Sequence, residues 1–416
     1  MSNTRKVLGA VAALAATALT IGAAMPATAA GAADKTLKIT GILPLTGALA
    51  FLYPPMQAGA YLAIDDINAA GGVLGNKVTL DMKDSGDGNN LAVSSQSATA
   101  AIAAKSDVVL GAAASGVTRN IINQLTGAGI VEISPSNTAP DLSTWKDNGF
   151  YFRTAPSDNL QGRIVANQIL QDGAQNVAIM YADNSYGNGL MNVAATTLTK
   201  AGATVGKFAF SEGETNFGSI VDKAMATSPD AILMISYDET KKALPALKAA
   251  GYNGGNVYLV DGNTIDYSKE SFASYLNGAK GTIPGAASPK SFTDRLVKEY
   301  AKLNNGKVLA DFTYGAESYD AVVLAALAAQ ASGKATGAGI KSQLTNVSLA
   351  GAGKVNVTSF AAGLKALKAG KKINYNGFSG PIEFDKNGDP TGAFIGIYRY
   401  DAKGVNHLIR TVAGNK

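Results

Sequence analysis

The sequence of 416 residues contains no cysteine and a single histidine, His407. Without cysteine, the chain can form neither disulfides nor thiolate metal sites, and it has no cysteine nucleophile. One histidine cannot build a multi-histidine metal site, and no G-x-S-x-G motif accompanies it to suggest a hydrolase triad. We therefore expect no metal, no cofactor and no enzymatic activity, and a fold held together by its hydrophobic cores alone.

An excess of one charge is also missing. The formal net charge is +5, and without Arg5 and Lys6 the remaining chain has 34 basic residues against 31 acidic ones. These charges are scattered, and no basic run with interleaved aromatic residues occurs, which argues against nucleic acid as a partner. The sequence also lacks a phosphate-binding motif. The nearest candidate, "AGAGKV" at 350–355, has neither the hydroxyl after Lys354 nor the glycine spacing of a P-loop.

Only one stretch is long and apolar, and it lies at the N-terminus. Arg5 and Lys6 precede an apolar run over 7–24, and the small residues "ATA" at 27–29 offer a cleavage position. This pattern predicts a signal peptide over residues 1–29. A membrane anchor is the alternative, but the run is Ala-rich, barely 18 residues long and lacks a stop-transfer pattern. Because the chain has no cysteine to carry a lipid, we expect an exported, unanchored protein in a periplasm or cell-wall space.

From Thr36 onward, short β-branched runs alternate with longer segments of helical spacing. "TLKITGILPL" has the pattern of a strand, and Ala60, Ile64 and Ile67 then lie on one face of a helix that ends at Gly71-Gly72. Such alternation indicates doubly wound α/β architecture with parallel sheets. The same strand pattern recurs in "KVTLDMKD", "SDVVLGAA", "GIVEISP", "NVAIMYAD", "ATVGKFAF", "DAILMISY" and "NVYLVDG".

The chain is longer than one hydrophobic core usually supports, so we expect two lobes. Breaks in the pattern at 150–159 ("FYFRTAPSDN") and 278–292 ("GAKGTIPGAASPKSF") suggest lobe boundaries. The helices predicted after the second break, "FTDRLVKEYAKL" and "SYDAVVLAALAAQ", would complete the first lobe. A final region, "GPIEFDKNGDPTGAFIGIYRYD", is predicted to form strands joined by a turn at Asn387-Gly388-Asp389.

Ligands of open parallel sheets bind beyond the carboxyl ends of the strands. The corresponding segments here are rich in hydroxyl, tyrosine and acidic side chains: "AAASGVT", "ISPSNTAP", "YADNSYGNG", "ISYDE" and "LVDGNT". We therefore take these segments as the candidate binding site.

Ser115 stands where a helix is predicted to begin, after the small residues 112–114. A serine at this position can cap its own helix. Alternatively, the N–H groups of Gly116 to Thr118 can hold a carboxylate, with the Ser115 and Thr138 hydroxyls as further donors. Small residues either let a ligand approach closely or permit tight packing between sheet and helix. Both interpretations stay open at this point.

Tyr186, Tyr237 and Asp261 follow three other predicted strands. Each tyrosine can be an ordinary packing or surface residue, but together they can close over a small ligand and donate through their hydroxyls. Asp261 can form a turn, or its carboxylate can face an ammonium group.

These segments, in order, carry a resemblance to a known family. "GILPLTG", "GAYLAIDDINAAGGVLGNKV", "GAAASGVT", "ISPSNTAPDL", "YFRTAPSDNLQG", "DNSYGNGL", "EGETNFGSIVDKA" and "FDKNGDPTG" resemble the extracytoplasmic solute-binding proteins of branched-chain amino acid ABC transporters. The resemblance covers nearly the entire mature chain. It implies two α/β lobes joined by a three-segment hinge, the Venus-flytrap or type I periplasmic binding fold, with an N-terminal lobe of 35–154 and 286–379 and a C-terminal lobe of 155–285 and 380–416.

The resemblance also assigns roles to single residues. Ser115 and Thr138 match the family's carboxylate-binding hydroxyls, the Ser136 carbonyl matches its acceptor for the ligand's amine, and Asp261 stands where the family has a glutamate facing that amine. Because Asp261 is one methylene shorter, a deeper ligand or a bridging water is implied. The ligand-binding set that we expect is Ser115, Gly116, Ser136, Asn137, Thr138, Tyr186, Tyr237, Asp261, Tyr314 and, from a loop of uncertain register, Phe51 and Tyr53.

The sequence thus predicts a monomeric solute receptor for an ABC importer, with a small hydrophobic amino acid as its leading ligand and a membrane permease as its partner. An amide, urea or an aromatic acid on the same scaffold is the alternative. An exported α/β hydrolase is the remote alternative from a different class of protein.

Overall fold

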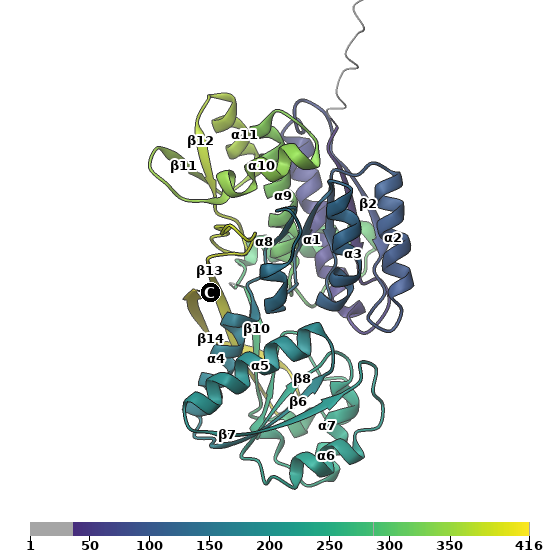
Figure 1. Ribbon diagram of the computed structural model, residues 1–416, viewed down its shortest axis with the longest axis vertical. Helices are drawn as coiled ribbons and strands as arrows, with labels where there is room; N and C mark the ends of the chain where they lie inside the picture. The colour runs from purple at the N-terminus through teal and green to yellow at the C-terminus, as the bar shows by residue number, and fades with distance from the viewer. Residues whose placement is uncertain (1–35, 286, 416) are drawn as a thin grey trace, which may run out of the picture. The chain divides into compact units, whose positions relative to one another are not determined.

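The computed structural model describes residues 36–285 and 287–415 (Figure 1). The predicted signal peptide lies outside the described residues. Among the helices that are described, none has the length and hydrophobicity needed to cross a membrane.

The first lobe is built on a five-stranded sheet of parallel strands in the order β2-β1-β3-β4-β5. The central strand β3 and its neighbour β4 are buried along their whole length. The strands are β1 (Lys38–Leu43), β2 (Thr79–Asp84), β3 (Val108–Gly111), β4 (Val131–Ser134) and β5 (Tyr151–Arg153).

Helices from two distant parts of the chain surround this sheet (Figure 1). The early ones are α1 (Tyr53–Ala69), α2 (Leu91–Ala103) and α3 (Ser115–Gly127). The late ones are α8 (Lys290–Leu303), α9 (Gly315–Ser332), α10 (Gly337–Ser348) and α11 (Phe360–Lys368), next to a small sheet of β11 (Lys354–Val357) and β12 (Lys372–Tyr375). Helix α9 is buried from Gly315 to Ala329, in keeping with the continuous apolar run over 321–329.

The second lobe contains a seven-stranded sheet in the order β14-β13-β10-β9-β8-β6-β7. Strands β6 to β10 are parallel, while β13 and β14 add an antiparallel edge, so this sheet is mixed. The strands are β6 (Asn176–Ala182), β7 (Thr204–Phe210), β8 (Ala231–Ile235), β9 (Val257–Leu259), β10 (Lys280–Pro284), β13 (Gly392–Tyr400) and β14 (Asn406–Asn415). Its helices are α4 (Asp158–Gln171), α5 (Ser185–Lys200), α6 (Gly218–Met225) and α7 (Thr240–Ala249).

Three connections link the two sheets: β5 to α4, β10 to α8, and β12 to β13. At two of them, Arg153 and Asp389 form an ion pair with both side chains fully buried. The guanidinium donates from Nε to Oδ1 (2.7 Å) and from Nη2 to Oδ2 (3.0 Å). This pair therefore fixes the end of β5 against the loop before β13. The strands fall on the predicted side of each lobe boundary, and the boundaries themselves stay predictions.

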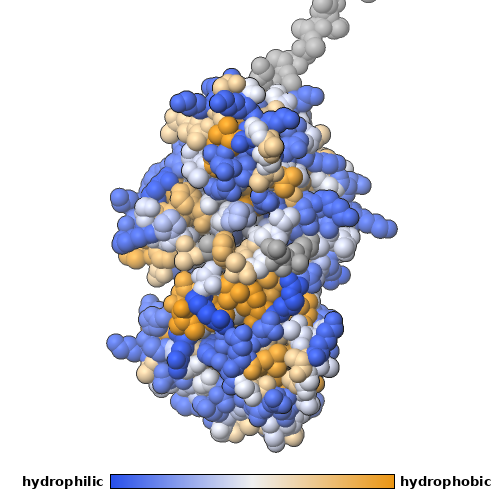
Figure 2. All heavy atoms as spheres, turned by 90° about the vertical axis from the view of Figure 1, so that its left-hand side faces the viewer, coloured by the Kyte–Doolittle hydropathy of each residue, from blue (hydrophilic) through white to orange (hydrophobic). Residues whose placement is uncertain are grey.

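The α/β class and the strands with strong apolar patterns agree with the sequence analysis. The turn predicted at 387–389 is present and is flanked by an isolated antiparallel bridge between Phe384 and Pro390. Strands β13 and β14 form a separate hairpin that turns at 401–405. On the face shown in Figure 2, most of the surface is hydrophilic, with apolar side chains gathered mainly in one band.

Candidate functional site

A buried cavity of about 20 Å³ lies at the carboxyl ends of the central strands. It has room for one or two water molecules. Both lobes contribute to its lining, which consists of Leu49, Leu52, Ala113, Ser115, Ser136, Thr138, Tyr186, Tyr237, Asp261, Gly262 and Tyr314. Seven of the eleven residues predicted from the sequence thus line one cavity.

The first-lobe wall of the cavity carries hydrogen-bond donors. Helix α3 begins at Ser115, whose hydroxyl makes no cap bond and instead accepts from the Ala139 N–H at 3.3 Å. The N–H groups of Val117 and Thr118 bond to the Ala114 carbonyl, so those of Ser115 and Gly116 are left without a partner in the described chain. The capping interpretation of Ser115 is therefore wrong, and the start of α3 is suited to hold an anion.

Thr138 and Ser136 lie in the loop after β4 and are almost fully buried. The Ser136 hydroxyl donates to the Ala113 carbonyl at 3.3 Å, and the Thr138 carbonyl accepts from the Asp158 N–H at 2.7 Å. Through these two hydrogen bonds, the loop after β4 is tied to the segment after β3 and to the start of α4, where the chain enters the second lobe.

The second-lobe wall carries two stacked tyrosines. The rings of Tyr186 and Tyr237 lie 5.3 Å apart with an interplanar angle of 12°. The Tyr186 hydroxyl donates to Oδ1 of Asp261 at 2.7 Å. The pair therefore combines an apolar surface with a polar tip directed at a carboxylate.

Asp261 is held by three side-chain donors. Oδ1 accepts from Tyr186 and from Nε2 of Gln161 (2.7 Å), and Oδ2 accepts from the Tyr314 hydroxyl (2.6 Å). Burial raises the pKa of Asp261 above its usual range, while the Tyr314, Tyr186 and Gln161 hydrogen bonds oppose that shift. Tyr314 stands at the start of α9 in the left-handed region (φ 60°), so its hydroxyl reaches Asp261 from the other lobe.

A second buried carboxylate, Asp158, was missed by the sequence analysis. It is 0 % exposed at the start of α4, and neither of its oxygens makes a hydrogen bond of normal geometry within the described residues. Burial raises its pKa well above the usual range, the negative charge of Asp261 adds to that shift, and the Thr138 side chain opposes it. Asp158 does not line the cavity itself, but its backbone N–H donates to the carbonyl of Thr138, which does.

Four predicted residues do not line the cavity. A Cβ on Gly116 would meet open space, and Asn137 uses its amide to bond the Ala113 carbonyl (2.7 Å) and the Tyr151 hydroxyl (2.9 Å). Phe51 and Tyr53 are half-buried outside it, and from the same loop Leu49 and Leu52 face the cavity instead. The loop whose register was left uncertain thus contributes Leu49 and Leu52 to the cavity. In the described chain, no group of three or more acidic or histidine side chains is placed to hold a metal.

Two α/β lobes with three connections and a buried polar cavity between their strand ends define the class of solute-binding receptors with the type I periplasmic binding fold. The family model for periplasmic binding proteins matches residues 36–404, and the chain belongs to this family. Members of the family are extracytoplasmic binding proteins rather than enzymes.

Two curated relatives match over most of their length. The chain is 30% identical to a substrate-binding protein of a chemotactic signal transduction system from Halobacterium salinarum, with 87% of each chain covered. It is 27% identical to a Leu/Ile/Val-binding protein from Rhizobium johnstonii, with 89% of this chain and 92% of the relative covered.

Solved structures show the same fold. A branched-chain amino acid transporter substrate-binding protein from Streptococcus pneumoniae, in complex with isoleucine, matches with a TM-score of 0.71, 22% identity and coverage of 92% of this chain and 100% of that one. A solute-binding protein of an ABC transporter from Rhodopseudomonas palustris, in complex with benzoate, matches with a TM-score of 0.70, 16% identity and coverage of 92% and 98%.

Proposed function

We propose that the protein is an extracytoplasmic receptor that binds a small aliphatic amino acid in the cavity between its lobes and delivers it to an ABC importer. The observation that carries this proposal is the opposition of two kinds of buried groups. Ser115, whose backbone N–H has no partner in the described chain, and Thr138 line the first-lobe side, and the carboxyl group of Asp261 lines the second-lobe side. A zwitterion with a carboxylate and an ammonium group complements both.

Two leucine residues of the protein in the cavity wall favour an aliphatic ligand. Leu49 and Leu52 line the cavity from the first lobe, and the stacked rings of Tyr186 and Tyr237 lie in its second-lobe wall. Apart from Asp261, the remaining lining residues are small or hydroxyl-bearing, so a branched hydrocarbon side chain has apolar partners on two sides.

Ligand entry requires the two lobes to separate, because the cavity of about 20 Å³ is smaller than any amino acid. Closure on a bound zwitterion would then be favoured because Ser115 and Thr138 come from one lobe and Asp261 from the other. Most of the acceptor capacity of Asp261 is occupied. The ammonium group would therefore share Oδ2 of Asp261 with the Tyr314 hydroxyl, or displace that hydroxyl from it.

Calorimetry with three matched ligands tests the proposal. Leucine should bind, whereas 4-methylpentanoate, which lacks the amine, and 3-methylbutan-1-amine, which lacks the carboxylate, should bind at least about tenfold more weakly, as expected for the loss of a hydrogen-bonded charge. Ser115→Ala should weaken leucine and 4-methylpentanoate alike. If 4-methylpentanoate binds as tightly as leucine, the amino acid assignment is lost.

An aromatic acid is the second candidate ligand. It is favoured by the benzoate-bound structure with the same fold and by the two stacked tyrosines in the wall. Benzoate needs the carboxylate donors around Ser115 but has no use for Asp261, so tight benzoate binding that survives Asp261→Asn would select this alternative.

We propose a membrane permease as the partner, and a monomer in the periplasm or cell-wall space as the working form. The relative from Halobacterium salinarum is named for chemotaxis, so a signal transducer is a second candidate partner. Solute uptake and chemotaxis assays on a strain that lacks the gene distinguish these partners. Loss of uptake would indicate a permease, and loss of chemotaxis alone would indicate a signal transducer.

A further inference from the structure

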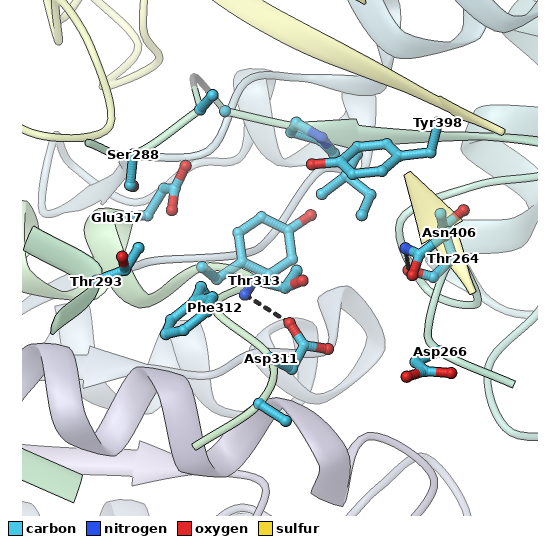
Figure 3. A pocket seen from close by; sticks show the side chains of 16 residues that line it. Thr264, Asp266, Ser288, Thr293, Asp311, Phe312, Thr313, Glu317, Tyr398 and Asn406 are labelled. Atoms are coloured by element: carbon cyan, nitrogen blue, oxygen red, sulfur yellow. Dashed lines mark hydrogen bonds between the residues drawn. The ribbon is translucent and has the colours of Figure 1, made fainter. Parts of the chain in front are cut away.

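A second pocket, of about 370 Å³, lies beside the connection from β10 to α8 (Figure 3). We call it the hinge-side pocket. Among the described residues, it shares only Tyr314 with the ligand cavity. Its side walls come from the loop before α9, from β13 and from the loop after β9, and its polar lining includes Thr264, Asp266, Ser288, Thr293, Asp311, Thr313, Glu317 and Asn406.

The charges in this pocket have one sign. Asp266, Asp311 and Glu317 line it, and its described lining contains no lysine, arginine or histidine. Asp266 is exposed and Asp311 is half-buried, so water screens both of them in part. Glu317 is different, because it is 5 % exposed.

Glu317 lies in the first turn of α9 and faces the pocket (Figure 3). Its carboxylate makes no hydrogen bond to another residue in the described chain, although Oε1 lies so close to Gly285 that a Cβ there would be 2.4 Å away. Burial raises the pKa of Glu317 to about 8; a hydrogen bond from its own backbone opposes that shift, and the charge of Asp320 adds to it. A buried carboxyl group that no other residue hydrogen-bonds is costly to ionise, and a cation in the pocket would remove much of that cost.

Aromatic rings provide the rest of the wall. Phe312, Tyr314 and Tyr398 line the pocket, and Phe312 and Tyr398 are half-buried, so part of each ring can contact an occupant. Burial raises the pKa of Tyr398 to about 12, and the negative charges of Asp311 and Glu317, which line the same pocket, add to that shift. Aromatic faces next to carboxylates are the usual recognition elements for ammonium groups.

We propose that the hinge-side pocket binds a small organic cation, whose ammonium group pairs with Glu317 and contacts the rings of Phe312 and Tyr398. An organic cation fits better than a metal ion, since the described residues include no group of three or more acidic or histidine side chains placed to hold one. The volume lies in the range of small-molecule sites.

Isothermal titration calorimetry on the mature chain tests this proposal with choline as the probe. The control ligand is 3,3-dimethylbutan-1-ol, which has the shape of choline without its charge. Choline should bind and the alcohol should not. Glu317→Gln, which keeps the size of the side chain, should weaken choline at least about tenfold, as expected for a lost charge pair in a partly desolvated site. Asp311→Asn should weaken it less, and Asp222→Asn, an exposed acid on α6 outside the pocket, should leave it unchanged.

Two further readouts locate the probe. Bound cation favours the ionised form of Glu317, so choline affinity should rise with pH through about 8 in the parent and much less in Glu317→Gln. Asp266, Asp311, Asp320 and Tyr398 are the other titratable groups around it, and Asp311→Asn should keep most of the pH dependence. Saturating leucine should not displace choline. No binding, equal binding of the alcohol, insensitivity to Glu317→Gln, or displacement by leucine would each overturn the proposal, and the first three do not depend on whether leucine is the ligand of the cavity.

Discussion

Tyr314 donates a hydrogen bond of 2.6 Å to Asp261, and this bond joins the start of α9 in the first lobe to the loop after β9 in the second. Both side chains are almost fully buried. The bond therefore stabilises the contact between the lobes directly at the ligand cavity.

Tyr314→Phe should lower the free energy of unfolding of the ligand-free protein. The substitution removes the hydroxyl donor and leaves a buried acceptor with one partner fewer, which costs roughly 1–3 kcal/mol. Tyr181→Phe is the matched control, because Tyr181 is half-buried on β6 and its hydroxyl makes no hydrogen bond within the described residues. Chemical denaturation measures both variants. Equal losses would show that the Tyr314 hydroxyl contributes nothing specific.

Asp261→Asn should separate amino acids from their deaminated analogues. The carboxylate attracts an ammonium group but repels a carboxylate, so the variant should weaken leucine at least about tenfold and leave 4-methylpentanoate unchanged or tighter. Calorimetry of both ligands provides the comparison. If leucine and 4-methylpentanoate lose affinity equally, Asp261 acts only through the shape of the site.

Amino acid binding should release protons. Burial raises the pKa of both Asp158 and Asp261, and their mutual repulsion adds to the shift of Asp158, so the pair holds protons above the usual carboxyl range. An ammonium group favours the ionised forms, which lowers both pKa values on binding. Affinity should therefore rise with pH above about 4 until the pair is ionised in the free protein. Calorimetry in buffers of different ionisation enthalpy counts the protons, and proton uptake would contradict this assignment. Asp158→Asn should reduce the number released.

The α/β class could be predicted because eight strands are rich in apolar or β-branched residues and alternate with segments of helical spacing. The strands that escaped prediction are β5, β10, β11, β12 and β14. Their strand state depends on pairing with neighbours, which the local sequence does not encode.

The sequence grouped several residues that follow predicted strands, and the structure places six of them, together with Tyr314, around one cavity. Asp158 was not among the predicted residues, because Ser157 caps α4 and an acid in the first turn has the ordinary pattern of a helix start. Its complete burial arises only where the two lobes meet. Asn137 shows the reverse case: its position in "ISPSNTAP" predicted a ligand contact, and its amide is instead used to join β3 to β5.

Asp389→Asn should destabilise the protein strongly. The substitution leaves the fully buried Arg153 without a counter-charge at the hinge, which costs about 3–5 kcal/mol. Asp294→Asn is the control, because its ion pair with Lys290 is exposed and worth at most about 1 kcal/mol. Thermal and chemical unfolding measure both. A loss for Asp389→Asn no larger than that of the control would mean that the buried pair contributes little.

Glu132 gives a prediction for stability against pH. It is fully buried on β4, neither oxygen makes a hydrogen bond of normal geometry in the described chain, and burial raises its pKa well above the usual range. In the unfolded chain the group ionises near pH 4.5. Above that pH only the unfolded state gains by ionisation, so this residue makes stability fall as pH rises towards the folded-state pKa.

Glu132→Gln should remove that fall. The difference in free energy of unfolding between the variant and the parent should shift in favour of the variant by about 1 kcal/mol or more from pH 4.5 to pH 8, because one unit of pKa difference corresponds to about 1.4 kcal/mol. Any effect of the amide that does not depend on pH cancels in this comparison. Urea denaturation of both proteins at the two pH values measures the gain. Asp222→Asn, at an exposed position on α6, should show no comparable change. If the parent and Glu132→Gln keep the same stability difference at both pH values, Glu132 is ionised in the folded protein and a partner for it must exist.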